Sequence, residues 1–390
     1  MSWKRKLGND WGRLGMMSEW NHSTINDVCV LVTDGSHSSP KSVHDGEYMV
    51  SVKDFTDYGF DFSSCRMISH DDYEVLKRNG CVPQIDDILI GKDGARFFED
   101  IIIYRQREKP ALLSSIAILR CDKSKILPDF LYYALRTPSF KQDVKDNYGS
   151  GSAIPRIILK DFKRMMVSYP SLEKQRSVIS VLTAIDSKIQ ANTEINDNLQ
   201  QQAQAIYSSM FIDNPDPAWS HGHLSDLITV KYGKDHKKLA DGIYPVYGSG
   251  GIMRYVERPL YNKESVLIPR KGTLNNVMYV NQPFWSVDTM FYTEMKLPNV
   301  AKFVYHFVKA KDLASMNAGS AVPSMTTDIL NAMEVVIPSA SALEEFESLV
   351  APMYEAMEAN DVQSKALSQM RDTLLPKLMS GKIDVSSVQL

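Results

Sequence analysis

The stretch that decides the fold is SLEKQRSVISVLTAIDSKIQANTEINDNLQQQAQAIYSSMFID, residues 171–213, which contains neither Gly nor Pro. Its apolar residues recur at alternating spacings of three and four, the heptad pattern of a coiled-coil helix. One seam position holds Val178, Ile185, Leu199 and Ile206. The other holds Leu182, Ile189, Ala203 and Met210. Asn192 and Asn196 interrupt the seam midway. The pattern predicts one long helix with a narrow apolar face.

The same arrangement returns 171 residues later, near the C-terminus. Its apolar positions are Leu349, Met353, Ala356, Leu367, Met370 and Leu374. Asn360 and Gln363 form its polar middle, and Leu343-Glu344 matches Leu172-Glu173 at the start of the first stretch. Two helices in the same register indicate an internal duplication.

The duplication also predicts how the two helices pack. The first helix leads from one globular part toward the next, and the second must return to close the repeat, so we expect them to run antiparallel. Their polar centres should then meet, and about 40 residues at 1.5 Å each make a spacer of roughly 60 Å with one globular part at either end. Pro352 lies on the seam side of the second helix. We expect it to bend this helix or to delay its start until about Ala351, because an interior proline removes a backbone hydrogen bond.

The globular parts of the chain repeat as well. WNHSTINDV at residues 20–28 is echoed by WSHGHLSDL at residues 219–227, and ILIGKDG at residues 88–94 by VLIPRKG at residues 266–272. The loops GSAIP (151–155) and GSAVP (319–323) precede the two helices. Short alternating runs between Gly, Asp and Ser turns predict strands, and short apolar runs predict helices packed on a sheet.

These repeats predict an α+β protein with two mixed α/β domains, related by a pseudo-two-fold axis and separated by an antiparallel coiled coil of two long helices. The expected parts are an N-terminal arm (1–19), a first globular domain (20–170), the central helix (171–213), a linker (214–218), a second globular domain (219–338), and the C-terminal helix with its tail (339–390).

Composition excludes some classes of protein and leaves others open. No apolar run approaches the ~20 residues of a membrane span, and no secretory signal is present, so we expect a cytoplasmic protein that does not contact a membrane. The four cysteines lie far apart and none has metal-ligand spacing, so we expect buried free thiols, and neither a metal nor another cofactor. They are Cys29, Cys65, Cys81 and Cys121.

The charge distribution permits contact with nucleic acid. The net charge is −3, but residues 219–338 carry 13 Lys and Arg against 10 Asp and Glu, while residues 339–390 carry 4 against 8. Only the local patch meets phosphate, so a neutral total can hide a surface that faces DNA.

Cationic turns are the strongest candidates for such a surface. Both turns follow a predicted buried strand, and their candidate residues are Lys92 and Arg96 in the first globular part, and Arg270, Lys271 and Thr273 in the second. A second cluster combines Tyr247, Ser249 and Arg254 beside a Gly-rich turn. Arg and Lys read guanine edges and phosphates, although each could equally be a solvated charge without a ligand.

Motifs that would indicate catalysis are weak. NPDP at residues 214–217 differs from the Asn-Pro-Pro-aromatic motif of adenine methyltransferases and is better interpreted as a linker. GSGG at residues 248–251 has the spacing of neither a dinucleotide-binding site nor a P-loop. A metal-dependent nuclease site could in principle be formed by Asp161 and Lys163 together with Asp86 or Asp87. Acid-x-Lys triplets are, however, common by chance.

Taken together, two globular parts each followed by a long helix, with a Gly-Ser-Ala-x-Pro loop before each helix, resemble the specificity subunit of a type I restriction–modification enzyme. The ending LLPKLMSGKI at residues 374–383 is also similar to that family. The resemblance implies a non-catalytic subunit in which each domain reads one half of a bipartite double-stranded DNA site. The helices would space the domains and dock two methyltransferase subunits, and restriction subunits with translocase activity would join afterwards.

The helices also carry apolar residues outside the expected seam: Ile195, Tyr207, Phe211, Phe346 and Leu375. These positions make sense if partner helices convert the pair into a four-helix bundle, so we expect them to bind the methyltransferase subunits. The rival hypothesis is a nuclease or methyltransferase-type DNA enzyme built on the same duplicated domains, which activity of the purified chain alone would reveal.

Overall fold

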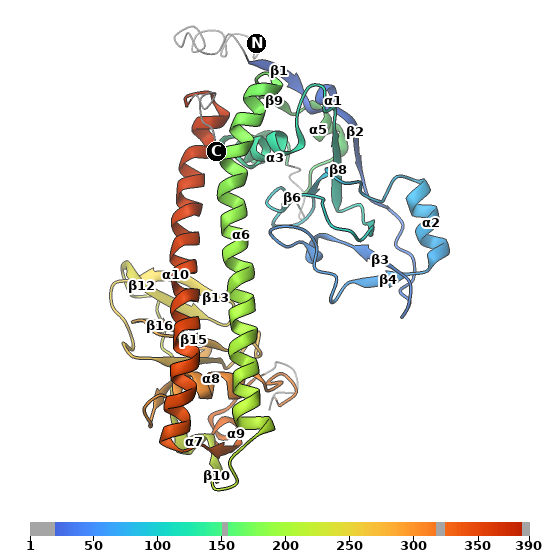
Figure 1. Ribbon diagram of the computed structural model, residues 1–390. Helices are drawn as coiled ribbons and strands as arrows, with labels where there is room; N and C mark the ends of the chain where they lie inside the picture. Colours follow the sequence, from blue (N-terminus) through green and yellow to red (C-terminus); the bar gives the residue numbers. More distant parts are fainter. Residues whose placement is uncertain (1–19, 150–154, 317–323, 384–390) are drawn as a thin grey trace. The chain divides into compact units, whose positions relative to one another are not determined.

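The computed structural model describes residues 20–149, 155–316 and 324–383. The chain divides into two compact units, the first formed by Met1–Gln190 with Ser364–Leu390 and the second by Ala191–Gln363. Each unit contains several β-sheets and one part of each long helix, α6 (Leu172–Ser208) and α10 (Ala340–Met379) (Figure 1). The predicted α+β class, with two similar domains of mixed sheets and two long helices that pack together, is confirmed.

The described residues of the first unit form three sheets. The strands β1 (Asn21–Thr24) and β9 (Met166–Tyr169) form an antiparallel pair. The four-stranded antiparallel sheet has the order β2-β8-β5-β6, with bounds Cys29–Asp34, Ile116–Cys121, Ile88–Gly91 and Ile101–Ile103. The third sheet has the order β4-β3-β7, with bounds Arg66–Ile68, Glu47–Val50 and Ala111–Leu112, and its β3–β7 pair is parallel. The helices are α1 (Ile25–Val28), α2 (His70–Arg78), α3 (Pro128–Arg136), α4 (Pro138–Asn147) and α5 (Leu159–Arg164).

The second unit repeats this topology. The strands β10 (Ser220–His223) and β18 (Glu334–Ile337) are antiparallel. The four-stranded sheet has the order β11-β17-β14-β15, with bounds Ile228–Tyr232, Met290–Met295, Ser265–Pro269 and Met278–Val280. The third sheet has the order β13-β12-β16, with bounds Gly251–Val256, Asp241–Gly248 and Trp285–Ser286, and its β12–β16 pair is parallel. The helices are α7 (Leu224–Leu227), α8 (Ala301–Lys309) and α9 (Thr327–Asn331). Both strand order and direction recur, so the chain contains two copies of one fold.

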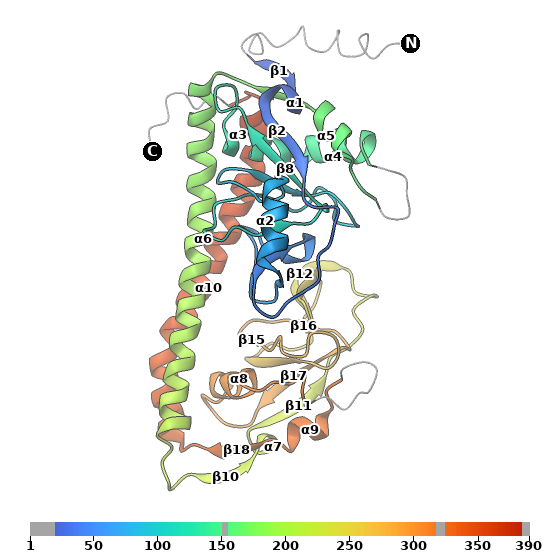
Figure 2. The same ribbon diagram turned by 90° about the vertical axis from the view of Figure 1, so that its right-hand side faces the viewer.

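One inner strand of each four-stranded sheet, β5 or β14, is buried along its whole length because both of its faces are covered. In β5, Ile88 and Ile90 face the cluster that contains α3 and the start of α6, whereas Leu89 faces the cluster formed with β3 and β7. In β14, Val266 packs in the cluster that contains α8 and the long helices, whereas Leu267 packs in the cluster formed with β12 and β16. Figure 2 shows α8 lying between the strands of the second unit and the helix pair. One short helix therefore joins each sheet to the long helices.

The seam predicted for the first helix is confirmed. All eight apolar positions of this seam are buried or half-buried. Asn192 is only 1% exposed and continues the seam through its polar middle. After Ser208 the helix widens into one π-helical turn, Ser209–Asp213, which buries Phe211.

The seam predicted for the second helix is wrong at three positions. Leu349, Ala356 and Met370 are exposed. A strict heptad of buried and half-buried residues runs along α10 through Phe346, Val350, Met353, Met357, Asn360, Ser364, Leu367, Arg371, Leu374 and Leu378. Phe346 and Val350 are fully buried in the core of the second unit and set the rotation of the helix. The true seam is therefore shifted by one residue at these three positions.

The two helices run antiparallel within each unit. In the second unit, Asn192 Nδ2 donates to Gln363 Oε1 at 2.9 Å, Asn360 Nδ2 donates to Asn196 Oδ1 at 2.8 Å, and Asn196 Nδ2 donates to Asp361 Oδ1 at 2.8 Å. In the first unit, Arg371 of α10 and Asp186 of α6 form an ion pair of 2.8 Å. The predicted meeting of the polar centres is thus confirmed.

Pro352 neither delays nor interrupts the second helix, which begins at Ala340 and continues to Met379. The proline side chain is exposed. None of the helices in the described parts of the chain has the length and hydrophobicity that a transmembrane span requires. All four cysteines are free thiols, and two of them, Cys81 and Cys121, are buried.

Candidate nucleic-acid interface

In the first unit, the predicted cationic turn leaves β5 and is held by backbone hydrogen bonds. Lys92 N donates to Ser115 O at 2.9 Å, and Ile157 N donates to Lys92 O at 3.0 Å. The turn then requires a φ of +92° at Gly94, a conformation that glycine adopts without strain. Gly94 N donates to Pro155 O at 2.9 Å, so the turn also meets the end of the GSAIP loop, whose residues 151–154 lie outside the described residues.

The turn after β14 in the second unit is built in the same way. Arg270 N donates to Thr289 O at 2.9 Å, and Met325 N donates to Arg270 O at 2.9 Å. Gly272 has a φ of +86°, and Lys271 forms an isolated bridge with Ser324. The GSAVP loop, residues 319–323, lies outside the described residues. The two turns are therefore structurally equivalent, as their sequences predicted.

Lys92 is not exposed, contrary to the prediction. Its side chain is 8% exposed, and Nζ lies 3.4 Å from Asp34 Oδ2 and 3.6 Å from Asp93 Oδ1. Asp34 ends strand β2, which is separated from β5 by β8, and its side chain is equally buried, so the pair forms inside the unit. Arg96, in contrast, is 75% exposed and pairs with Asp100 at 2.6 Å.

In the second unit, Arg270 of the turn is partly exposed. The guanidinium carbon of Arg270 lies 5.2 Å from the centre of the Tyr232 ring, and Nη1 donates to Asp288 O at 3.4 Å. Lys271 and Thr273 are exposed. Cation–π contact orients a guanidinium without neutralising its charge, so Arg270 remains able to bind an anion or a base edge.

The Gly-rich hairpin turn between β12 and β13 lies against this cationic turn. A Cβ atom on Gly272 would come within 2.6 Å of Ser249 Oγ, so glycine permits the close approach. Asn276 Nδ2 donates to Ser249 O at 2.8 Å. We call the combined surface the second-unit turn face; its members are Ser249, Arg270, Lys271, Thr273 and Asn276. Asn276 was not predicted, because its role depends on a contact 27 residues away.

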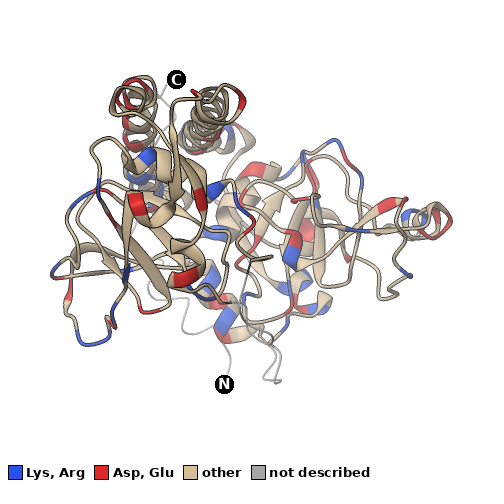
Figure 3. Ribbon diagram, turned by 90° about the horizontal axis from the view of Figure 1, so that it is seen from below, with Lys and Arg blue, Asp and Glu red and all other residues tan. Residues whose placement is uncertain are grey.

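Tyr247 and Arg254 do not belong to this face. The Tyr247 ring is buried against Phe284, with ring centres 6.1 Å apart, and its hydroxyl accepts a hydrogen bond from Gln282 at 3.3 Å. Arg254 donates to Asp241 Oδ1 at 2.6 Å and is only partly exposed. The structure therefore separates Ser249 from the two residues that were grouped with it. Over the described parts of the chain, basic and acidic residues are interspersed (Figure 3).

The carboxylates considered for a nuclease site have internal partners. Asp87 is fully buried and accepts two hydrogen bonds of 2.8 Å from Arg120. Asp86 pairs with Lys123 at 2.6 Å, and Asp161 pairs with Arg164 at 3.0 Å. In the described ranges, no group of three or more His, Cys, Asp or Glu side chains could hold a metal ion.

Four of the five residues expected to bind partner subunits are buried within their own unit. Tyr207, Phe211 and Phe346 pack in the core of the second unit, where the rings of Phe211 and Phe346 are 5.2 Å apart. Leu375 packs in the core of the first unit and is 6% exposed. The premise that these side chains lie free on the helices is wrong, because they attach the helices to the domains. Only Ile195, 45% exposed, is available on the surface.

Comparison with known proteins finds similarity along most of the chain. The model of the type I restriction modification DNA specificity domain matches residues 17–201 and 218–346. The type I restriction enzyme MjaIX specificity subunit of Methanocaldococcus jannaschii is 24% identical over 310 residues, covering 68% of this chain and 71% of that protein. The HindI specificity subunit of Haemophilus influenzae is 21% identical over 373 residues, covering 66% of this chain and 78% of that protein.

Solved structures with a similar fold include a further relative. The type I restriction–modification system S subunit from M. genitalium superposes with a TM-score of 0.57 at 17% sequence identity, covering 92% of this chain and 96% of that one. At this identity the likeness concerns the fold alone. The family model matches each half of the chain separately, in agreement with the duplicated topology.

Proposed function

This chain belongs to the type I restriction–modification DNA specificity family, and we propose that each of its two units reads one half of a bipartite site in double-stranded DNA. The chain is the DNA specificity subunit of a type I system, a recognition component rather than a catalytic one. The observation that carries the proposal is the repeated topology, in which an equivalent turn follows β5 and β14 and is held by equivalent hydrogen bonds. Two copies of one recognition fold on one chain suit a target with two parts.

The second-unit turn face is the proposed DNA contact of that unit. Arg270 and Lys271 supply charge, while Ser249, Thr273 and Asn276 supply groups that can hydrogen-bond to bases or phosphates. In the first unit, Arg96 is the exposed cation of the equivalent turn. Lys92, which is held by Asp34, is proposed to support that turn rather than to contact DNA.

The long helices are proposed to space the half-sites and to dock two methyltransferase subunits, with restriction subunits joining the assembled complex. The 37 residues of α6 correspond to a length of about 55 Å at 1.5 Å per residue. Apolar side chains remain exposed on both helices, including Ile195 (45%) and Val362 (64%), and support a further helix contact. A protein that acts on cellular DNA in such a complex is proposed to work in the cytoplasm.

The test uses the full chain assembled with its methyltransferase subunits. Binding is measured on DNA in which the two half-sites are substituted separately, at two salt concentrations. We expect each substitution to weaken specific binding by about 1–3 kcal/mol per base pair, while substitutions in the intervening gap have no effect. Binding that depends on one contiguous block of base pairs would contradict the proposal.

A second assay addresses the enzymatic alternative. The purified chain alone is incubated with DNA and Mg²⁺, or with DNA and S-adenosylmethionine. We expect neither cleavage nor methyl transfer until the methyltransferase subunits are added. Activity of the chain alone would favour a nuclease or methyltransferase built on the same fold.

A further inference from the structure

A cavity of about 590 Å³ opens in the second unit beside α10. Its walls come from α10, α8 and the segment around β15, and its chemistry is carried by Glu264, Tyr279, Lys302, Tyr354, Glu358 and Asp361. We call it the α10 cavity. Its volume falls within the range of about 300–1,000 Å³ that is typical of ligand sites.

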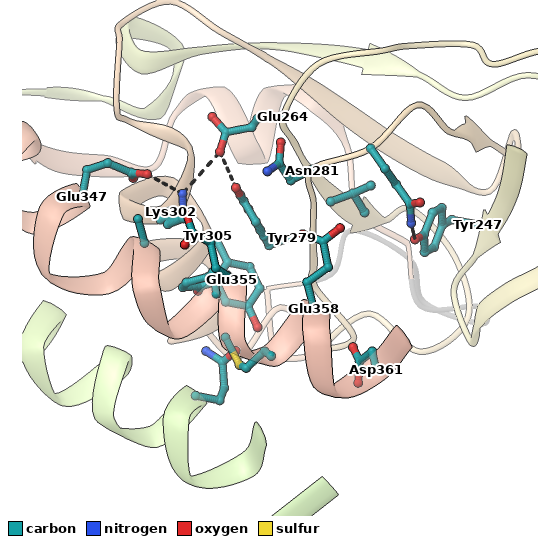
Figure 4. A pocket seen from close by; sticks show the side chains of 16 residues that line it. Tyr247, Glu264, Tyr279, Asn281, Lys302, Tyr305, Glu347, Glu355, Glu358 and Asp361 are labelled. Atoms are coloured by element: carbon teal, nitrogen blue, oxygen red, sulfur yellow. Dashed lines mark hydrogen bonds and ion pairs between the residues drawn. The ribbon is translucent and has the colours of Figure 1, made fainter. Parts of the chain in front are cut away.

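One end of the α10 cavity already holds an ammonium group. Lys302 is 5% exposed, and its Nζ lies 2.5 Å from Glu347 Oε1 and 3.4 Å from Glu264 Oε1. The same Nζ lies 5.2 Å from the centre of the Tyr279 ring and 5.5 Å from that of Tyr354. Figure 4 shows this pair of carboxylates around Lys302. The wall is thus built from the groups that hold cations in proteins, carboxylates and aromatic rings.

Further carboxylates of the cavity lie on α10. Glu355, Glu358 and Asp361 also line the cavity, and no ion pair found among the described residues involves any of them. Figure 4 shows Glu358 pointing away from α10 toward the wall that carries Asn281. Burial raises the pKa of Asp361, although Asn196 donates a hydrogen bond to its carboxylate. A partly desolvated carboxylate without a cation is stabilised when a cation arrives.

The shape of the carboxylate array indicates the kind of cation. Glu347 is already paired with Lys302, so the carboxylates still available to a ligand run from Glu355 to Asp361, six residues or about 9 Å along α10. Charge spread over this length matches an extended segment better than a single small ion. Val362 follows Asp361 and is 64% exposed, so an apolar contact is available beside the acidic wall. A protein segment can use both features, whereas a free polyamine uses only the charge.

We propose that the α10 cavity receives an arginine- or lysine-bearing segment of a partner subunit, whose cation binds Glu358 and Asp361. The inference rests on the proposed role of the long helices in docking partner subunits, and it adds the chemistry of one contact. Tyr247, Asn281 and Gln282 line the same cavity and offer hydrogen-bonding groups to the backbone of the segment.

The experiment compares two double variants of the full chain. Glu358→Gln with Asp361→Asn removes the two cavity charges and keeps the side-chain shapes. Glu344→Gln with Glu345→Gln is the matched control, because both residues are exposed on the same helix and neither lines the cavity. The dissociation constant for the methyltransferase subunit is measured at low and high salt, and thermal unfolding verifies that both variants fold.

We expect the cavity variant to bind the methyltransferase subunit about threefold to tenfold more weakly at low salt, with a smaller difference at high salt. The control should bind as the unchanged chain does. Equal affinity of the cavity variant and the unchanged chain would overturn this inference and leave the proposed function intact. Failure of the unchanged chain to bind any methyltransferase subunit would overturn both.

A calorimetric titration of the chain with spermidine tests the other candidate occupant of the α10 cavity, a free polyamine. If spermidine binds the unchanged chain but not the cavity variant, and methyltransferase affinity is the same for both, the cavity serves a small polycation and the inference is wrong. If methyltransferase binding is lost while spermidine does not bind either protein, the segment is supported as the occupant.

Discussion

Lys92 Nζ lies 3.4 Å from Asp34 Oδ2 in the first unit, whereas the equivalent cation of the second unit, Arg270, lies over the ring of Tyr232. The equivalence follows from register, because Asp34 and Ile90 both pair with Ala117, while Tyr232 and Ile268 both pair with Phe291. An acid at the end of β2 thus turns the first cation inward, and a tyrosine at the end of β11 leaves the second one charged and accessible. The two copies of the turn therefore place their cations in different surroundings.

Replacing Lys92 with Met should therefore reduce stability rather than DNA recognition. The substitution leaves Asp34 buried without its ammonium partner, and we expect the free energy of unfolding to fall by on the order of 3 kcal/mol. His37, 3.4 Å from the other oxygen of Asp34, limits the loss. Denaturant unfolding followed by circular dichroism measures the effect. Arg96→Met is the control, since its pair with Asp100 is exposed and its loss should cost less than about 1 kcal/mol.

Arg270→Ala should relax specificity in one half-site only. If its guanidinium contacts a base edge, we expect a loss of about 1–3 kcal/mol at one position of the half-site read by the second unit. Competition binding of the assembled methyltransferase with DNA substituted in either half-site measures this loss. A loss that falls equally on both half-sites would contradict the division of labour between the units.

Lys271→Ala should act differently, because an exposed ammonium is better suited to a phosphate. We expect binding of all sequences to weaken alike, and the slope of log affinity against log salt to decrease by about one ion. A salt titration of the same complex measures the slope. An unchanged slope together with unchanged affinity would identify Lys271 as a solvated charge.

The sequence predicts the architecture well because the duplication repeats each signal. The seam of α6, the meeting of Asn192 with Gln363 and the equivalence of the two turns all follow from local spacing. The seam of α10 does not, because its rotation is set by Phe346 and Val350, which pack against a domain core assembled from distant strands.

The candidate site is predicted less completely, because exposure depends on partners far away in the chain. Nothing near Lys92 in the sequence indicates that Asp34 will neutralise it. Tyr207 and Phe211 are apolar positions outside the α6 seam, and the sequence cannot distinguish a partner protein from the chain's own domain as the surface that covers them. Which side chains are covered is decided by how distant segments of the chain pack together, and this packing cannot be read from local sequence.

Tyr207 and Ile195 should respond differently to the same substitution. Tyr207 is 2% exposed, and Tyr207→Asp places a carboxylate among Phe211, Phe303 and Phe346, so we expect it to destabilise the second unit by about 3–5 kcal/mol. Ile195→Asp should leave stability within about 0.5 kcal/mol and weaken association with the methyltransferase subunit. Thermal unfolding and co-purification measure the two effects. Unchanged co-purification of Ile195→Asp would contradict the proposed docking role of this surface.

His306 should make the second unit sensitive to acid. The ring is fully buried between α6, α8 and α10, with Nδ1 donating to Gln204 Oε1 at 2.8 Å and Nε2 accepting from the Tyr354 hydroxyl at 3.0 Å. Both hydrogen bonds suit the neutral ring, and burial lowers the pKa of His306 to about 4.

The unfolded chain takes up this proton near pH 6.5 and the folded chain only near pH 4, so the unfolded state binds more protons between these values. The contribution of His306 to stability is therefore complete above about pH 6.5 and decreases as the pH falls toward 4, by up to about 3 kcal/mol. Denaturant unfolding of the full chain and of His306→Gln across this range isolates the contribution, because glutamine does not titrate. If the difference in unfolding free energy between the two proteins were independent of pH, the neutral buried imidazole would not be the source of the acid sensitivity.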